Sequence, residues 1–215
     1  MPTPASDSAT SPAWWDEARS TLRRTDPRLD ALLGQQVGVG RLESRGDPFV
    51  TLVRSIVGQQ ISVKAAESVW LRLAKAARTV TPERVSRMRV STLTGAGLSG
   101  RKAEYVRDLA LHFREGTVDP AHWPGLDDES VIAELVQVRG IGRWTAEMFL
   151  IFNLMRPDVF PVDDLGLLKA LSIHFNDGQP IDRAHALTLG EPWRPWRTLA
   201  TWSLWRSLDP VPVAY

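Results

Sequence analysis

Apolar residues recur along much of this chain with the period of an amphipathic helix. The first clear stripe covers positions 49, 52, 53, 56 and 57, which follow the i, i+3, i+4, i+7, i+8 spacing. Asp47 and Pro48 precede this stripe in the order expected of an N-cap and a first helical residue. The pattern therefore predicts a helix that begins at residue 48 and is interrupted near Gly58.

Similar stripes predict further helices along the chain. The expected helices start after Ser62, after Thr81, near Gly100, near Asp128 and before Trp144, and Pro157 ends the last of these. The alternation typical of strands is nearly absent. The sequence predicts an all-α fold with nine or ten short helices.

Composition excludes several classes of protein. Of the 215 residues, 43% are hydrophobic and 24% charged, which is typical of a globular protein, and no apolar run is long enough to cross a membrane. The absence of cysteine removes disulfides, thiolate catalysis and cysteine-bound metals, and the four histidines lack the spacing of a metalloprotease. A metal hydrolase is not indicated, and no cofactor is expected. Residues 1–12 have no apolar segment of a signal peptide and are predicted to be a flexible tail.

Charge is distributed unevenly although the net charge is only +1. Residues 60–107 hold ten lysines and arginines against three acidic residues, and residues 108–135 hold seven acidic residues against one arginine. The split can produce a basic face for a polyanion. It can equally reflect two solvated helix faces, and the sequence leaves both interpretations open.

The segment 135–146 carries the most specific signal. Its Gly140-Ile141-Gly142 sequence lies between two apolar helical stretches, with Arg139 and Arg143 on either side. Two glycines permit a tight turn with positive φ and leave backbone amides uncovered at a helix N-terminus, which attracts an anion such as phosphate. An ordinary helical hairpin with a glycine turn explains the spacing equally well.

Together with other segments, this hairpin resembles the helix-hairpin-helix DNA glycosylases, specifically the 3-methyladenine DNA glycosylase II type. The resemblance runs from about Asp47 to Trp205 and includes Gln59-Gln60-Ile61-Ser62, residues 97–103, Pro161-Val162-Asp163-Asp164 and residues 193–197. Arg139 departs from the family pattern, which often has proline there.

The resemblance implies two helical subdomains with the active-site cleft between them. Residues 13–47 plus 157–215 would form one subdomain and residues 48–156 the other, which ends in the hairpin. It also implies that Gln60 is the wedge that fills the hole left by a flipped base, and a polar loop residue before the Ser62 cap is the alternative. The other implied DNA-binding residues are Gly140, Ile141, Gly142, Arg143, Thr145, Arg101 and Lys102. For Arg101 and Lys102, a solvated helix face explains the two cations equally well as a phosphate contact. Such hairpins can hold a monovalent cation on backbone carbonyls, here around Val136, Val138 and Ile141.

Catalysis is assigned to Asp164, the position of the family's aspartate. Breaking the bond from a base to sugar C1′ passes through an oxocarbenium-like transition state, which a carboxylate stabilises. An aspartate before an apolar helix is also a common N-cap, and that structural role is the alternative for both Asp163 and Asp164. We expect one acid to cap the helix, whose inner face would be Leu165, Leu168, Leu171 and Phe175.

Aromatic side chains suit recognition of an electron-poor, alkylated base. Trp144 and Trp205 match aromatic pocket positions of the resembled family, and Met148 and Leu165 occupy two further pocket positions. The tryptophans at 193, 196 and 202 are expected to belong to the core.

The resemblance implies a monofunctional glycosylase of base excision repair that acts on damaged double-stranded DNA as a monomer, in the bacterial cytoplasm at the nucleoid. A bifunctional glycosylase/lyase would need a Schiff-base lysine near the hairpin, where this chain has Trp144. A non-catalytic DNA-binding module would need the hairpin but no carboxylate in a pocket.

Overall fold

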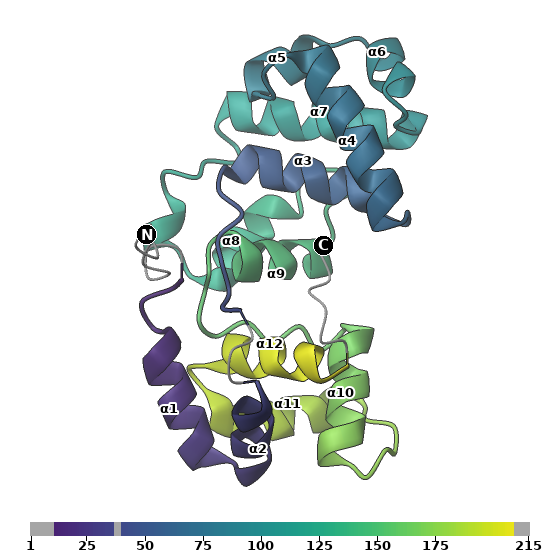
Figure 1. Ribbon diagram of the computed structural model, residues 1–215. Helices are drawn as coiled ribbons and strands as arrows, with labels where there is room; N and C mark the ends of the chain where they lie inside the picture. The colour runs from purple at the N-terminus through teal and green to yellow at the C-terminus, as the bar shows by residue number, and fades with distance from the viewer. Residues whose placement is uncertain (1–10, 37–39, 209–215) are drawn as a thin grey trace, which may run out of the picture. The chain divides into compact units, whose positions relative to one another are not determined.

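The computed structural model describes residues 11–36 and 40–208 (Figure 1). Within these ranges the chain forms twelve α-helices and two 3-10 helices and no strand, which confirms the all-α prediction. The expected number of nine or ten helices is an underestimate, because a helix of six residues such as α6 is too short to show a stripe. The predicted tail lies outside the described residues, apart from Ser11 and Pro12. Pro12 is buried, and its carbonyl accepts the Trp15 amide at 3.0 Å.

The described chain divides into two compact units, which are continuous through α9 (Arg143–Phe152). Unit 1 holds the described residues of 1–44 and 150–213, and unit 2 holds residues 45–149. The division falls inside α9, between residues 149 and 150, whereas the predicted subdomain boundary follows residue 156. Each unit has its own apolar core.

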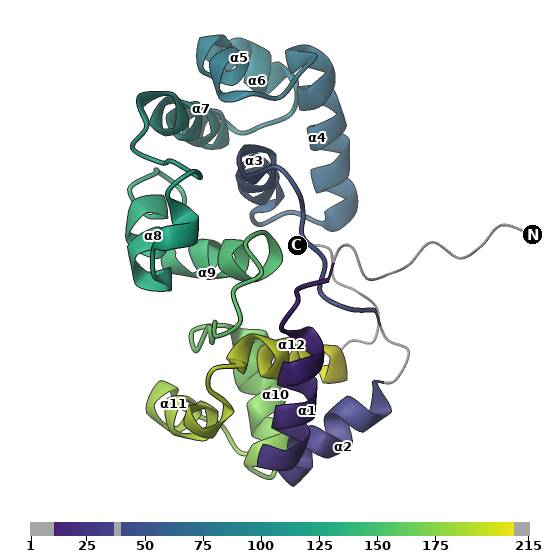
Figure 2. The same ribbon diagram turned by 90° about the vertical axis from the view of Figure 1, so that its left-hand side faces the viewer.

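Unit 2 contains the helices that lead up to the hairpin. They are α3 (Pro48–Gly58), α4 (Val63–Ala77), α5 (Pro82–Arg87), α6 (Val90–Gly95), α7 (Gly100–Glu115), the 3-10 helix η1 (Trp123–Gly125), α8 (Asp128–Leu135) and the first part of α9. Helix α3 lies against both α4 and α7, and α7 also packs on α5 and α6 (Figures 1 and 2).

Side-chain caps begin these helices where the sequence predicts them. Asp47 accepts the Val50 amide at 2.8 Å and Pro48 follows as the first helical residue of α3. Ser62 and Thr81 cap α4 and α5 in the same way. Between the helices, an edge-on series of rings from Phe49 through Phe113 and Trp123 to Phe149 fills the core, with centroids 5.2 to 6.5 Å apart.

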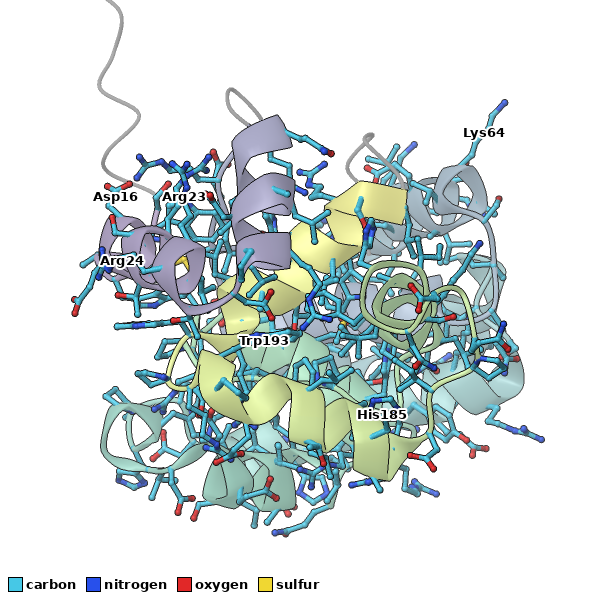
Figure 3. The ribbon with its side chains drawn as sticks, turned by 90° about the horizontal axis from the view of Figure 1, so that it is seen from below. Asp16, Arg23, Arg24, Lys64, His185 and Trp193 are labelled. Atoms are coloured by element: carbon cyan, nitrogen blue, oxygen red, sulfur yellow. The ribbon has the colours of Figure 1, made fainter. Side chains whose placement is uncertain are left out.

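Unit 1 combines both ends of the described chain. Its helices are α1 (Trp15–Thr25), α2 (Pro27–Gln35), the end of α9, α10 (Leu165–Phe175), α11 (Arg183–Gly190), the 3-10 helix η2 (Glu191–Trp193) and α12 (Arg197–Leu208). Helix α12 packs on α10, α1 and α2 (Figure 1). At the end of α1, Arg24 is exposed and extends outward, whereas the exposed Arg23 pairs with Asp30 of α2 (Figure 3).

Tryptophans form much of the core of unit 1. Trp15 meets Trp202 edge-on at 5.1 Å, and Trp193 lies between the rings of Phe160 and Phe175. Trp193 and Trp202 are buried, and the half-buried Trp196 stacks on Trp14 at 6.1 Å. These residues are structural, as their helical spacing predicted.

Helix α10 buries a different face from the one expected. Its buried residues are Leu167, Ala170, Leu171 and Phe175, whereas Leu165 is 81% exposed. Leu165 precedes the first member of this stripe by two residues and lies on the side of the helix turned away from it, whereas Leu168 is half-buried at the edge of the stripe. The prediction of the inner face was therefore wrong for Leu165, whereas Leu171 and Phe175 are buried as predicted.

Candidate active site and nucleic-acid interface

The hairpin turn depends on glycine at position 140. Gly140 has a φ of 88°, and an added Cβ would lie 2.1 Å from the Tyr105 ring of α7. The turn closes with a hydrogen bond from the Ile141 amide to the Val138 carbonyl at 3.1 Å. A larger residue at 140 would be strained by its backbone conformation and would clash with Tyr105.

Gly142 differs from Gly140. Its φ is not positive, so the expectation that both glycines serve a positive-φ turn is wrong for this position. An added Cβ at Gly142 would meet nothing within 4 Å, and the residue is exposed. The fold therefore does not require glycine here, although its small size leaves the start of α9 open to a partner. First-turn amides of a helix lack carbonyl partners within that helix and suit an anion.

Both arginines beside the turn are paired with carboxylates. Arg139 donates to Asp108 through its amide at 2.9 Å and its Nε at 3.2 Å. Arg143 binds Glu129 with both Nη atoms and Glu147 through Nε at 3.0 Å. The hydrogen bond to Glu129 raises the pKa of Arg143 and holds the pKa of Glu129 below its usual range. These pairs offset the arginine charges, so a phosphate bound at the predicted site would be attracted more by the backbone amides than by the two arginines.

The remaining predicted residues of the hairpin and α9 differ in exposure. Ile141 and Thr145 are buried, so any contact with DNA from Ile141 would use its backbone. Trp144 is 39% exposed, whereas Met148 is buried. For the predicted cation site, the Val138 carbonyl already accepts the Ile141 amide, and Val136 is exposed. That site stays a prediction.

The predicted wedge residue lies in a short loop after α3. Gln60 is exposed and has a φ of 57°, in the left-handed region that a glutamine rarely adopts. The preceding Gln59 donates its side-chain amide to the Gly140 carbonyl at 2.8 Å. The wedge loop (residues 59–61) is thus tied directly to the hairpin turn.

Arg101 and Lys102 of α7 have different surroundings. Arg101 is exposed, whereas the Lys102 ammonium donates to the carbonyls of Val57 at 2.8 Å and Gln59 at 2.6 Å. The sequence left a phosphate contact or a solvated face as alternatives for Lys102. Instead its ammonium binds main-chain oxygens at the end of α3.

Asp164 stands at the N-terminus of α10 and is buried. Its Oδ1 accepts the Leu167 amide at 2.7 Å, as an N-cap, and the Trp205 indole Nε1 at 2.8 Å. The capping role and the predicted catalytic role therefore fall on one residue. Asp163 is exposed and paired with Arg183 at 2.9 Å.

Close packing fixes the carboxylate of Asp164. A Cβ on Gly166 would lie 3.1 Å from Asp164 Oδ1 and 3.4 Å from the Trp205 ring. Trp205 also stacks on Phe152, with centroids 5.9 Å apart and planes at 15°. Exposed Leu165 adjoins this cluster in sequence. Trp144 and Met148 belong to unit 2, so a pocket that they share with Asp164, Leu165 and Trp205 stays a prediction.

Sequence reasoning missed several residues that position these groups. Phe152 and Gly166 hold Trp205 in place, while Tyr105 and Asp108 fix the hairpin from α7. Phe152 and Tyr105 could have been noticed as aromatic residues that follow family motifs, the hairpin segment and residues 97–103 respectively. Nothing in the sequence distinguishes Asp108 from an acidic residue on a solvated helix face.

Residues 11–36 and 40–208 contain no cluster of three histidines or acidic residues that could hold a metal ion. Over the same ranges, every helix is too short or too polar to span a membrane.

The family model described as "HhH-GPD superfamily base excision DNA repair protein" matches residues 53–195. The Schizosaccharomyces pombe protein named DNA-3-methyladenine glycosylase 1 is 31% identical over 84% of this chain and 80% of its own length. A crystal structure of a Bacillus halodurans DNA-3-methyladenine glycosidase superposes with a TM-score of 0.82 at 34% identity, covering 89% of both chains. The Schizosaccharomyces pombe enzyme in complex with abasic DNA gives a TM-score of 0.76 at 28% identity, over 92% of this chain and all of that one.

This chain belongs to the HhH-GPD superfamily of base excision DNA repair proteins. Within that superfamily it is of the 3-methyladenine DNA glycosylase type, as its sequence motifs indicated. It is shorter than several relatives of this type. The chain spans 63% of a Bacillus subtilis relative and 59% of the Escherichia coli DNA-3-methyladenine glycosylase 2.

Proposed function

We propose that this chain is a monofunctional DNA glycosylase of base excision repair. It hydrolyses the N-glycosidic bond of alkylated bases of the 3-methyladenine kind, flipped out of damaged double-stranded DNA. The observation that carries the proposal is the buried Asp164 carboxylate, held by the α10 amide of Leu167 and by Trp205. Family membership and the names of the relatives support the substrate class.

Asp164 would act on the sugar. As the bond from C1′ to the base nitrogen breaks, its electron pair leaves with the base and positive charge develops on the sugar. A carboxylate held in place stabilises that charge without reorganising, and a water oxygen then bonds to C1′ and loses a proton. An alkylated purine already carries positive charge, so the leaving base needs no general acid.

The other residues would bind DNA and the base. Trp144 and Trp205 would stack against the cationic base, with Met148 and Leu165 lining the same pocket. The amides at the start of α9 would hold a phosphate, and Gln60 would enter the duplex. We further propose that the protein works as a monomer, without a cofactor, in the bacterial cytoplasm at the nucleoid.

Base release tests the proposal directly. The protein is incubated with methylated duplex DNA and the freed bases are identified by chromatography. We expect 3-methyladenine and related alkylated bases from the wild type. Binding of DNA without any base release would instead identify a non-catalytic DNA-binding module.

Strand cleavage distinguishes the second enzymatic alternative. Because Trp144 occupies the place of a Schiff-base lysine, and the next lysine along the chain is Lys169, no strand nick should accompany base release. Borohydride should trap no covalent protein–DNA adduct on gels. An adduct would identify a bifunctional glycosylase/lyase and would contradict the monofunctional assignment.

A further inference from the structure

Lys102 occupies a position where a cation is unfavourable for its own helix. It lies in the first turn of α7, whose N-terminus carries partial positive charge. Ser99 caps this end of the helix through the Lys102 amide at 3.3 Å. An interaction outside α7 therefore has to offset the unfavourable electrostatic energy of a lysine at this position.

That interaction is with the C-terminal end of α3. The last carbonyls of a helix have no partner in the helix and carry partial negative charge. The Gln59 amide covers the Ile56 carbonyl at 3.4 Å, and the Ile61 amide covers that of Gly58 at 3.4 Å. Lys102 Nζ supplies the partner of Val57 at 2.8 Å and also binds the Gln59 carbonyl at 2.6 Å. Burial lowers the pKa of Lys102, which agrees with an ammonium withdrawn from water.

These hydrogen bonds meet at the wedge loop. Gln60 follows Gln59 directly and holds a left-handed conformation that its side chain does not favour. Gln59 is bound on both sides, by Lys102 at its carbonyl and by Gly140 at its side chain. A strained residue keeps its conformation only when its neighbours are fixed in this way.

The same helix also holds the hairpin. Tyr105 and Asp108 follow Lys102 at intervals of three residues, which makes successive members neighbours on the α7 surface. Tyr105 packs against Gly140, and Asp108 binds the amide and Nε of Arg139. One stretch of α7 thus contacts both the wedge loop and the hairpin turn.

We propose that Lys102 is a positioning residue for the wedge: it holds Gln60 in its left-handed conformation and keeps the wedge loop at a fixed distance from the phosphate-binding turn. The inference rests on the proposed function for the role of Gln60. In this assignment Lys102 does not contact phosphate. It acts on DNA only through the loop that it orders.

A double-mutant cycle tests the coupling between the two residues. Single-turnover release of an alkylated base is measured for the wild type, Gln60→Ala, Lys102→Met and the double variant. We expect each single change to slow release, Lys102→Met by about tenfold or more because it removes two charge-assisted hydrogen bonds. The double variant should be no slower than the slower single variant, since residues that act through one another are not additive. A double variant whose loss in the rate of base release equals the product of the two single losses would overturn the proposal.

Two further measurements exclude other roles for Lys102. The affinity for undamaged duplex is followed over a range of salt concentrations, and its log–log slope should be the same in Lys102→Met and the wild type. A slope that falls by about 0.9 would identify a phosphate contact and would overturn the proposal. Lys75→Met serves as the matched control, because it removes an exposed lysine of α4 at the same change in charge.

Hydrogen exchange of the free protein separates this inference from the proposed function. Amides of residues 58–62 should exchange about tenfold faster or more in Lys102→Met than in the wild type or Lys75→Met. Unchanged exchange would overturn the proposal whatever the activity. A wild type that releases no base would contradict the proposed function, and the exchange result would still decide whether Lys102 orders the loop. If Lys102→Met does not fold, Lys102→Gln, which removes the charge and is too short to reach both carbonyls, replaces it in each measurement.

Discussion

Asp164 has two roles, as the N-cap of α10 and as the proposed catalytic carboxylate, and its Oδ1 atom makes the hydrogen bonds that serve both. As an N-cap it accepts the Leu167 amide, and as the proposed catalytic carboxylate it must hold one orientation toward the sugar. The Trp205 indole fixes that orientation from α12. Asp163, one residue earlier, is exposed and paired on the surface, so the adjacent acids have different environments. The difference arises from burial, which the dipeptide sequence does not reveal.

Isosteric changes at the two acids should separate these environments. Asparagine is as good an N-cap as aspartate, so Asp164→Asn should leave the free energy of unfolding nearly unchanged. Base release should fall by about a hundredfold or more, because the transition-state charge loses its partner. DNA binding should persist.

Asp163→Asn is the matched control for this change. It breaks an exposed ion pair with Arg183, which contributes at most about 1 kcal/mol to stability. Base release and unfolding are measured for both variants. A larger loss of activity in Asp163→Asn than in Asp164→Asn would show that the catalytic assignment within the pair is reversed.

Helices in this protein begin where capping side chains allow it and are aligned by contacts from other helices. The hairpin illustrates both effects, because α7 fixes its turn through Tyr105 and Asp108. Its two glycines serve different purposes. Gly140 is needed by the fold, whereas Gly142 is needed only if something binds at the start of α9.

Valine at each glycine should therefore give different results. Gly142→Val should leave the melting temperature nearly unchanged but weaken binding to damaged and undamaged duplexes alike, because its side chain would cover the amides. Gly140→Val should weaken binding and also lower stability by at least about 1–2 kcal/mol from its backbone conformation alone. Thermal melts and binding titrations check both. Full affinity in Gly142→Val would exclude the start of α9 as the phosphate site.

The N-cap of helix α2 contributes to the stability of the fold in a pH-dependent way. Burial alone would raise the pKa of its N-cap Asp26, but hydrogen bonds from the side chain and amide of Arg28 and the charge of Arg28 lower it below its ordinary value. This carboxylate therefore stabilises the fold at neutral pH, and its contribution is lost as the pH falls from about 4 through the lowered pKa.

Removal of this cap should show that dependence. Asp26→Ala should lower the free energy of unfolding by about 1 kcal/mol at pH 7. The gap to the wild type should close as the pH is lowered below about 4, which denaturant titrations at several pH values measure. A gap that stays constant down to the lowest pH would contradict the role of the ionised carboxylate.

At the scale of the whole molecule, both ends of the described chain contribute to unit 1. Trp15 of α1 and Trp202 of α12 are far apart in sequence and meet in one core. Helix α12 also carries Trp205, which holds Asp164. The proposed catalytic group thus depends on the N-terminal helices through the packing of α12.

Trp15→Ala tests this dependence. Truncation of a buried tryptophan costs about 3–5 kcal/mol, and the loss should destabilise unit 1. Base release should fall at temperatures where the wild type is stable, while the hairpin in unit 2 still binds duplex. Calorimetry and activity measured on the same samples check this. Unchanged melting and activity would show that α12 keeps its place without α1.

The sequence by itself determined the local structure. Asp47, Ser62 and Thr81 cap the helices that they precede, because a cap depends on residues three positions apart. The positive-φ turn at Gly140 is local in the same sense, because a glycine between two apolar helices predicts it. Sequence could not choose the buried face of α10, since Leu165-Gly166-Leu167-Leu168 offers two overlapping apolar stripes.

Only the tertiary structure decided which groups face one another. Packing against α12 buries Leu167 and Leu171 and leaves Leu165 exposed, because burial depends on the neighbour that a helix meets. Lys102 binds Val57 of α3 and Arg143 binds Glu129 of α8, partners that lie 45 and 14 residues away in the sequence. The sequence does not reveal whether a charged side chain contacts water, a carboxylate or a carbonyl. For Lys102 and for the pair of Arg143 with Glu129, the packing of different helices determines the partner.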